Sequence, residues 1–361
     1  MFRIDRRLVQ NIDWPLVVTA LAIVAVGLLT IGSLSPFRWG GGIAFRQLLW
    51  VLLGLGLLVL IMSLDYRSLV RIAPALYVIG VILLFAVFVV GRTVSGARRW
   101  IALGPISVQP SELAKLILIL ALAWTLTWRR ERFRGNMWLV LGLLAPMFLL
   151  VVKQPDLGTA LVLLPVLLAM LLASGLPMKK LGFMLLAGLA VTPLAWVVMK
   201  GYQRERLLVY LDPFRDPLGS AYNVIQAKIA IGSGQLVGKG IEGATQSRLA
   251  FLPERHTDFI FAVFAEEWGF LGCLLLIAGY LFLLLRGYEI ADRARDPIGR
   301  LLALGVTVLL ASQVLVNLGM VTGLLPIVGI PLPFFSYGGS SMVVSLMALG
   351  LLLSVRMRQF L

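Results

Sequence analysis

The stretch of sequence that decides the fold is Leu252-Pro253-Glu254-Arg255-His256-Thr257-Asp258, which runs directly into an apolar segment over residues 259–285. A helix needs ~20 apolar residues to cross a hydrocarbon core of ~30 Å, and this segment is long enough to do so. The charged stretch therefore lies at the water boundary of a predicted membrane helix. Such a boundary is typical of a protein that does chemistry at the membrane surface.

Apolar runs of this kind recur along the whole chain. Hydrophobic residues make up 60% of the sequence and charged residues 14%, which excludes a soluble domain of ordinary composition. We therefore predict an all-α polytopic membrane protein, a single transmembrane domain over residues 1–361. Its ten predicted transmembrane helices span residues 15–34, 46–64, 68–91, 111–128, 137–152, 159–175, 179–200, 259–285, 299–322 and 338–355.

The distribution of Lys and Arg predicts the orientation of these spans. Basic residues precede the first span, follow the fourth, precede the seventh and follow the eighth, and the connecting loops share one side. The positive-inside rule makes that side cytoplasmic, together with both termini. The net charge of +15 then reflects topology and attraction to anionic membrane lipids, and no soluble basic domain is present to bind nucleic acid. The single cysteine, Cys273, lies inside the eighth span, which excludes an intrachain disulfide.

A long extracytoplasmic loop, residues 201–258, separates the seventh and eighth spans. Loops of this length are usually functional or disordered, and its aromatic residues argue for order. Apolar residues at nearly helical spacing over 221–231 predict an amphipathic or re-entrant helix, with a plain connector as the alternative. The last external loop, 323–339, carries no charge and is rich in Pro and Gly, so we expect a structured re-entrant cap.

Three carboxylates recur at equivalent places: Glu112, Asp156 and Asp258 each stand near the start of a span that runs from outside to inside. Each one alone is explained as a helix cap, because carboxylates accept hydrogen bonds from the free N–H groups at a helix start. Together they predict a polar cavity, since acids at the membrane boundary are costly. Lys115, three residues after Glu112, either forms an ion pair with it or points a cation into the same cavity.

Basic residues accompany the acids on the outer side of the predicted topology. Arg204, Arg206, Lys239 and Arg255 suit an anionic lipid headgroup, because the guanidinium fork of arginine matches phosphate; a solvated loop surface is the alternative. His256 is the only histidine and cannot form a histidine-rich zinc site, so it caps or positions its neighbours. Inside the eighth span, Glu266 and Glu267 either line a polar interior or lock helix packing.

At this point the sequence resembles a known family, SEDS (shape, elongation, division and sporulation). The motifs that carry the resemblance cover nearly the whole chain in order, and Arg255 is similar to the elongation branch rather than the division branch. They are Gln109-Pro110-Ser111-Glu112, Gln154-Pro155-Asp156-Leu157-Gly158-Thr159, Tyr202-Gln203-Arg204-Glu205-Arg206, Asp216-Pro217-Leu218-Gly219, residues 252–259 and Pro333-Phe334-Phe335-Ser336-Tyr337-Gly338-Gly339-Ser340.

The resemblance implies a peptidoglycan glycosyltransferase of the bacterial cytoplasmic membrane that polymerises lipid II beside a class B penicillin-binding protein. It implies that Asp258 is catalytic and that Glu112, Lys115, Gln154 and Asp156 line the central cavity. Mg²⁺ or Mn²⁺ held by Asp258, Glu112 and Asp156 is a further hypothesis, because these ions prefer oxygen ligands. A lipid II flippase and a scaffold without catalysis are the two other function classes.

Overall fold

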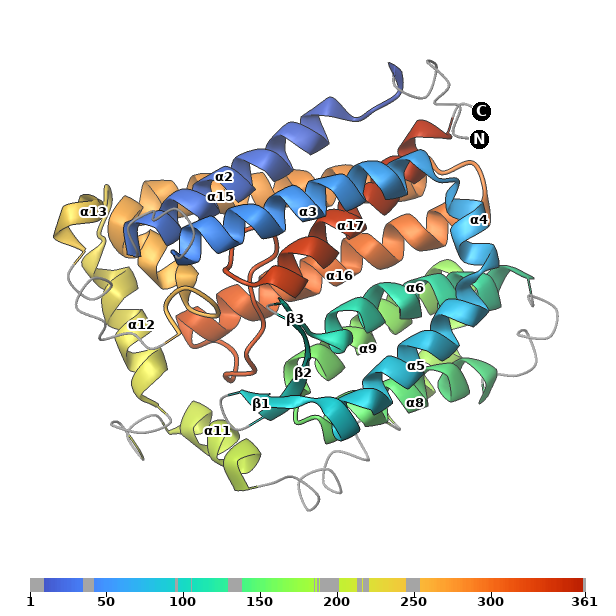
Figure 1. Ribbon diagram of the computed structural model, residues 1–361, viewed down its shortest axis with the longest axis horizontal. Coiled ribbons are helices and arrows are strands. Elements are labelled where there is room, and N and C mark those ends of the chain that lie inside the picture. The colour runs from blue at the N-terminus through green and yellow to red at the C-terminus, as the bar shows by residue number, and fades with distance from the viewer. Residues whose placement is uncertain are drawn as a thin grey trace.

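The computed structural model describes residues 10–34, 42–94, 97–104, 106–128, 138–184, 186, 188, 201–212, 216, 221–244 and 254–359. Within these residues the protein is mostly helical, and its long helices run side by side in a bundle (Figure 1). Both chain ends lie at one end of the bundle. Three helices outside the main bundle, α11 (Gly201–Leu211), α12 (Tyr222–Ser233) and α13 (Gly240–Gly243), lie toward the opposite end.

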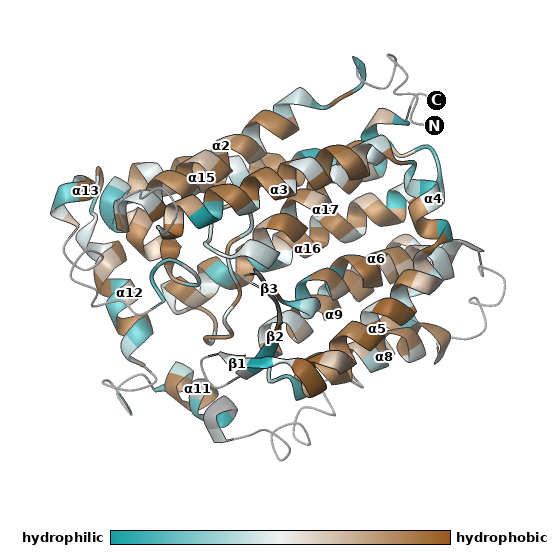
Figure 2. Cartoon of the chain, viewed as in Figure 1, coloured by the Kyte–Doolittle hydropathy of each residue, from teal (hydrophilic) through white to brown (hydrophobic). Residues whose placement is uncertain are grey.

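Seven described helices are long and apolar enough to cross a membrane. Figure 2 shows them as predominantly hydrophobic along their length. They are α2 (Trp14–Leu34), α3 (Ile43–Ser63), α5 (Ala73–Val90), α6 (Pro110–Trp128), α15 (Ile260–Asp292), α16 (Pro297–Thr322) and α17 (Gly339–Met357). Two apolar helices, α8 (Trp138–Lys153) and α9 (Leu157–Ala173), are shorter. The predicted seventh span, 179–200, lies mostly outside the described residues.

Two predicted spans differ from the observed helices. The third is divided into α4 (Tyr66–Arg71) and α5, because Pro74 has no N–H to continue the helix and fits the first turn of a new one after Ile72. The start of α4 is capped by the Asp65 side chain, which accepts from the Arg67 N–H at 2.9 Å. The eighth extends to Asp292 and is broken at Gly269, whose φ of 63° and ψ of −165° are not helical. Glycine adopts that backbone conformation without the steric cost that a side chain would impose.

The segment 92–108 is a small antiparallel sheet, whereas the prediction of an all-α chain left it as a loop. Its three strands, β1 (Arg92–Val94), β2 (Ala97–Leu103) and β3 (Ile106–Val108), pair in sequence order. The strands are short, so the alternation of apolar and polar residues that indicates a strand is weak in the sequence. The sheet places Arg99 of β2 beside the start of α9, where its side chain has a structural role described below.

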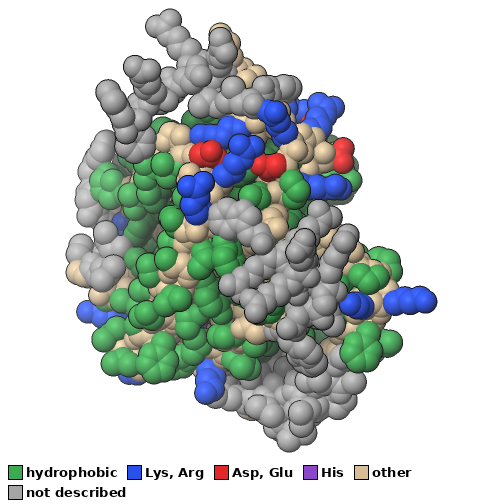
Figure 3. All heavy atoms as spheres, turned by 90° about the vertical axis from the view of Figure 1, so that its right-hand side faces the viewer, with side chains coloured by type: hydrophobic (Ala, Val, Ile, Leu, Met, Phe, Trp, Pro, Cys, Tyr) green, Lys and Arg blue, Asp and Glu red, His purple; other side chains and the backbone are tan. Residues whose placement is uncertain are grey.

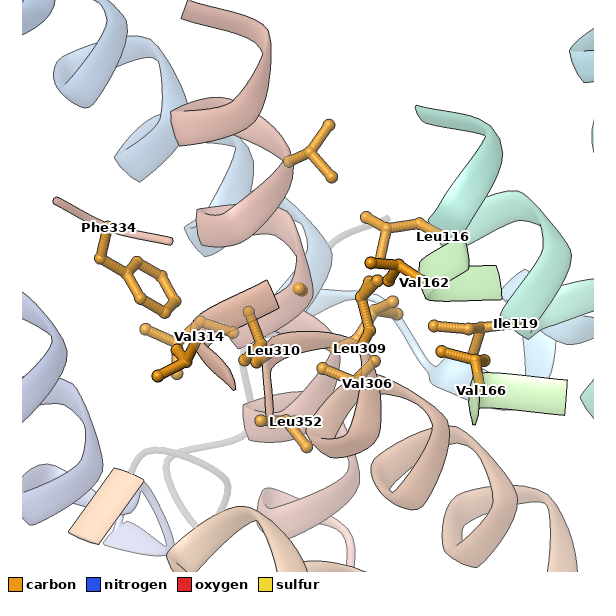
Figure 4. Close-up of a cluster of buried hydrophobic side chains, with 14 of the residues drawn as sticks. Leu116, Ile119, Val162, Val166, Val306, Leu309, Leu310, Val314, Phe334 and Leu352 are labelled. Carbon is orange, nitrogen blue, oxygen red and sulfur yellow. The ribbon is translucent and has the colours of Figure 1, made fainter. Parts of the chain in front are cut away.

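The core of the bundle forms where α6, α9, α16 and α17 meet. Figure 4 shows side chains from these helices interlocking with Phe334 of the α16–α17 segment, residues 323–338. All of them are buried, so this part of the fold is a close-packed unit that fixes the relative positions of the four helices. The labelled residues are Leu116, Ile119, Val162, Val166, Val306, Leu309, Leu310, Val314, Phe334 and Leu352.

The segment 323–338 lies against the bundle without regular secondary structure, in agreement with the predicted cap. Irregular backbone that packs inside a bundle of apolar helices needs partners for its peptide groups, and side chains of neighbouring helices supply them. Gln47 Nε2 donates to the Ser336 carbonyl oxygen at 3.1 Å, and Tyr280 Oη donates to the Pro333 carbonyl oxygen at 2.6 Å. A methyl group on Gly27 of α2 would lie 2.6 Å from the Phe335 carbonyl oxygen, so this helix must be bare there.

Charged side chains gather at the end of the bundle that carries the chain ends. Figure 3 views that end and shows Lys and Arg mixed with Asp and Glu. The ion pairs of this region join separate helices: Arg286 contacts Asp13 at 2.7 Å and Glu289 at 2.5 Å, and Arg356 lies 3.6 Å from Asp13. These ion pairs tie the start of α2 to α15 and α17 at this end of the bundle.

Candidate functional site

Asp258 lies in a turn directly before α15 and is half-buried. The N-cap of that helix is the next residue, Phe259, so Asp258 is not the cap that its position in the sequence suggested. The turn is closed by backbone hydrogen bonds, in which the N–H of Thr257 donates to the Glu254 carbonyl oxygen at 3.1 Å. The position of the aspartate is therefore set by the turn and by its neighbours in space.

Two residues of distant segments surround Asp258. Asn317, fully buried in α16, donates from Nδ2 to the Asp258 carbonyl oxygen at 2.9 Å and to the Ile330 carbonyl oxygen at 2.7 Å. Gly329 has a φ of 70°, and a methyl group on it would lie 3.2 Å from Asp258 Oδ2. The Asp258 carboxylate thus lies against the backbone of the α16–α17 segment at Gly329.

Asp156 is in a different situation, because both of its carboxylate oxygens are used by the protein. Oδ2 accepts from Ser111 Oγ at 2.9 Å, Gln109 Nε2 at 3.1 Å and Thr159 Oγ1 at 3.0 Å. Oδ1 accepts from the Thr159 N–H at 3.3 Å, which makes Asp156 the N-cap of α9, and it lies 3.7 Å from Arg99. The side chain is buried, and this network joins the starts of α6 and α9 to the sheet.

Glu112 and Lys115 form the buried ion pair that their spacing on α6 predicted. Lys115 Nζ lies 2.7 Å from Glu112 Oε1, and both side chains are at most 5% exposed. The second carboxylate oxygen of Glu112, Oε2, has no hydrogen-bond partner among the described residues. Burying a carboxylate oxygen without a hydrogen-bond donor costs free energy. The Glu112–Lys115 pair is therefore a polar site inside the apolar bundle.

Asp156 and Asp258 are connected through the α16–α17 segment rather than through direct contact. A methyl group on Gly158, two residues after Asp156, would lie 2.7 Å from the Val328 carbonyl oxygen and 2.7 Å from Ile330. Gly329, between these two residues, contacts Asp258. Residues 328–330 therefore lie between the start of α9 and the Asp258 turn, so the Asp156 network and Asp258 belong to one end of the bundle.

Lys239 lies at the break in α15. Its N–H donates to the Glu266 carbonyl oxygen at 3.0 Å, and its ammonium lies 3.7 Å from Glu266 Oε1. The neighbouring Gly234 and Gly238 contact the same helix so closely that a methyl group would lie 2.0 Å and 2.1 Å from its carbonyl oxygens. The glycine-rich block thus docks α12 and α13 on α15, and these contacts explain its composition (Figure 1).

The remaining predicted site residues are placed unevenly. Gln154 is buried and donates from Nε2 to the Leu84 carbonyl oxygen at 2.7 Å, so it ties α8 to α5. Arg204 on α11 and Arg255 in the Asp258 turn are half-buried, and the Arg206 side chain lies outside the described residues. Arg255 and Asp258 stand three residues apart in the same turn.

His256 joins the Asp258 turn, to which it belongs, to Tyr337 of the α16–α17 segment. The N–H of Tyr337 donates to the His256 carbonyl oxygen at 2.9 Å, and the two rings meet edge to face at 5.6 Å. Burial lowers the pKa of His256 below its ordinary value of 6.5; Glu254 acts against this shift, and Arg255 adds to it. The imidazole is therefore neutral at pH 7 and packs against Tyr337, in agreement with a positioning role.

Glu112, Asp156 and Asp258 do not form a common metal site in this arrangement. Within the described ranges, no group of three or more His, Cys, Asp or Glu side chains is placed to hold one ion. Four hydrogen bonds already converge on the Asp156 carboxylate, which makes it a structural acceptor. The residues present do not fit an ion shared by the three acids.

Comparison with known proteins assigns the family. The sequence matches the family described as cell cycle protein FtsW/RodA/SpoVE over residues 13–360. The chain belongs to this family. It is the SEDS family, as the motifs predicted.

Relatives and a solved structure extend the SEDS match over nearly the full chain. The chain is 41% identical over 355 residues to the peptidoglycan glycosyltransferase MrdB of Escherichia coli K12, covering 96% of this chain and 93% of MrdB. It is 38% identical to a probable peptidoglycan glycosyltransferase FtsW of Geobacter metallireducens, covering 99% and 98%. A chain solved in a study of polymerization and crosslinking by a peptidoglycan synthase complex is 39% identical, with a TM-score of 0.81 and coverage of 97% and 98%.

Two residues of this SEDS chain matter to the site more than the sequence indicated. Arg99 of β2 holds the start of α9 through Asp156 and the Gln154 and Pro155 carbonyl oxygens. Asn317 was missed. An amide inside a long apolar span is the signal that points to it, because buried polar groups need hydrogen-bond partners.

Proposed function

We propose that this protein is a peptidoglycan glycosyltransferase that polymerises lipid II into glycan strands at the outer face of the bacterial cytoplasmic membrane. Support comes from the family, from relatives that carry this activity in their names over nearly the whole chain, and from the Asp258 turn. We assign it to cell elongation on the basis of Arg255, on which the resemblance to that branch rests.

The observation that carries the proposal is the contrast between two aspartates at the same end of the bundle. The Asp156 carboxylate is buried and fully engaged, whereas Asp258 is half-buried, lies before the helix cap and has its carboxylate against Gly329. A general base must be able to reach its substrate, which a half-buried side chain does more readily than a fully buried one. Asp258 meets this requirement better than Asp156 or the Glu112–Lys115 pair.

In the proposed reaction Asp258 accepts the proton of the 4-hydroxyl group of the acceptor sugar. The resulting oxygen nucleophile attacks C1 of the donor sugar with inversion, and the bond from C1 to the pyrophosphate oxygen breaks. The polyprenyl pyrophosphate leaves with the electron pair and carries the new negative charge. Arg255 in the same turn and Arg204 on α11 supply cations for that charge, since arginine binds phosphate through two parallel N–H groups.

We place the hypothesis of a divalent cation at Asp258, which is the most exposed of the three acids. Mg²⁺ is usually bound by one or two carboxylates together with substrate phosphates, which suits a site completed by the pyrophosphate of lipid II. The steps above are written without a metal. Adding EDTA, and then Mg²⁺ or Mn²⁺, to the polymerisation assay tests this hypothesis separately from the assignment of Asp258 as the base.

We further propose ten transmembrane spans with both termini in the cytoplasm and residues 201–258 outside. The common location of the two chain ends and the ion pairs at that end support this topology (Figure 1, Figure 3). In a Cys273→Ala background, a cysteine at residue 242 should react with an impermeant thiol reagent applied outside. A cysteine at residue 292 should react only after the membrane is opened, and the reverse result would overturn the topology.

The direct test of the proposed function supplies lipid II to the purified protein in detergent, with and without a class B penicillin-binding protein. We expect glycan strands whose length or rate increases when the partner is present. Reconstitution in vesicles distinguishes the flippase: movement of lipid II between leaflets without polymerisation of externally added lipid II would contradict the proposal. Absence of both activities from a folded protein with its partner would favour the scaffold.

A further inference from the structure

A buried asparagine on α16 holds the proposed catalytic turn in place. Asn317 is completely buried, and its single amide nitrogen donates to two carbonyl oxygens, those of Asp258 at 2.9 Å and Ile330 at 2.7 Å. The Asp258 oxygen belongs to the turn before α15, and the Ile330 oxygen belongs to the segment between α16 and α17. One side chain thus joins two irregular segments to a rigid helix of the core.

The chemistry of the contact explains why the residue is an asparagine. Two carbonyl oxygens face it, and a primary amide supplies two N–H donors from one nitrogen, whereas a hydroxyl supplies one and a carboxylate none. The amide oxygen Oδ1 is buried without a hydrogen-bond partner among the described residues. The side chain is therefore placed for its donors, and the unsatisfied acceptor is the cost of that placement.

The contact bears on the carboxylate because of the residue next to Ile330. Gly329 leaves no gap for a side chain, since a methyl group there would lie 3.2 Å from Asp258 Oδ2. By fixing the Ile330 and Asp258 carbonyl oxygens together, Asn317 fixes the distance between Gly329 and the carboxylate. Residues 328–330 are in turn seated on Gly158 of α9, so the helices that carry the bundle core also position Asp258.

We infer that Asn317 is a positioning residue for glycosyl transfer, which sets the location of the Asp258 carboxylate relative to the substrate without touching the substrate itself. This inference rests on the proposed function of Asp258. A catalytic group displaced by about 1 Å can cost about 10²-fold in rate, because the reacting atoms leave the attack geometry. Substrate binding depends on contacts along the whole substrate and is less sensitive to such a displacement.

The test replaces the amide by a side chain of similar size without donors, Asn317→Leu, and by one that keeps a single donor, Asn317→Ser. Purified variants are compared with wild type for kcat and KM with lipid II, for the pH dependence of kcat and for melting temperature. We expect kcat to fall by about 10²-fold in Asn317→Leu and by less in Asn317→Ser, with KM within about twofold of wild type. The pH dependence of kcat should shift in both variants, because the surroundings of the carboxylate change.

Thr307→Val is the matched control, since Thr307 is also buried on α16 and donates to a carbonyl oxygen of its own helix, that of Ala303. It should lower the melting temperature without changing kcat or its pH dependence. If Asn317→Leu does not fold, Asn317→Ser carries the test. Wild-type kcat in a folded Asn317 variant, with Asp258→Asn inactive, would overturn this inference alone. An active Asp258→Asn would overturn the proposed base first, and the inference with it.

Discussion

Replacing Asp156 by alanine should destabilise the protein strongly, because its carboxylate joins three parts of the fold. The change removes the acceptor for Ser111, Gln109 and Thr159, and the ion-pair partner of Arg99. Loss of a helix N-cap costs about 1 kcal/mol. Each buried donor left without a partner costs about 1–3 kcal/mol, and Ser111 and Thr159 are both buried.

The lost cap and the two unpaired donors together amount to a loss of about 3–7 kcal/mol. In a chain of this size the loss corresponds to a fall in melting temperature on the order of 5–10 °C. Asp156→Asn retains one carbonyl oxygen as acceptor and should lose roughly half as much. The assay is thermal unfolding of the purified protein in detergent, with polymerisation measured well below the melting temperature of each variant.

Asp292→Ala serves as the matched control, because Asp292 is an exposed acid at the end of α15 and should change the stability by less than about 0.5 kcal/mol. We expect folded Asp156→Asn to keep most of its polymerisation rate. A melting temperature equal to wild type in Asp156→Ala would refute the structural role. So would an Asp156→Asn variant of normal stability whose rate falls 100-fold, because that outcome would place the carboxylate at the substrate.

Three further outcomes are expected. Lys115→Met should cost about 3–5 kcal/mol by leaving Glu112 buried without its cation, and adding Glu112→Gln should recover part of the loss, measured by thermal unfolding. Because the pKa of His256 is lowered on folding, its neutral form stabilises the protein above about pH 6.5 and less so as pH falls; His256→Gln should therefore lose less melting temperature between pH 7.5 and 5.5. Arg204→Gln should weaken lipid II binding and Arg204→Lys should restore it in part, and unchanged kinetics in both would return this arginine to a solvated surface role.

The features of the fold that sequence could predict are those set by local composition. Long apolar runs predict membrane helices because length and hydropathy alone determine them, and the helix over 222–233 follows from its spacing. The break at Gly269 was not predicted, because it depends on the approach of Gly238, a contact between distant segments. The sheet of residues 92–108 was missed for the similar reason that its short strands are stabilised by pairing rather than by their own pattern.

The site was predicted in part for the same physical reason. The ion pair of Glu112 and Lys115 follows from their spacing on one helix, since side chains three residues apart face one another. The different roles of Asp156 and Asp258 do not follow from the sequence, because both stand before an apolar helix. They are separated by tertiary partners: Arg99 engages the first, and Asn317 holds the backbone of the second.

The central claim is that Asp258 is the base of glycosyl transfer, and polymerisation of purified lipid II by Asp258→Asn tests it most directly. Asparagine keeps the size of the side chain and leaves the Asp258 carbonyl contact with Asn317 intact, but it cannot accept the proton of the sugar hydroxyl. Asp212→Asn, at an exposed acid directly after α11, is the control and should polymerise at the wild-type rate. We expect Asp258→Asn to fold with a melting temperature close to wild type, to bind lipid II and to form no glycan strands, whereas polymerisation near the wild-type rate would contradict the claim.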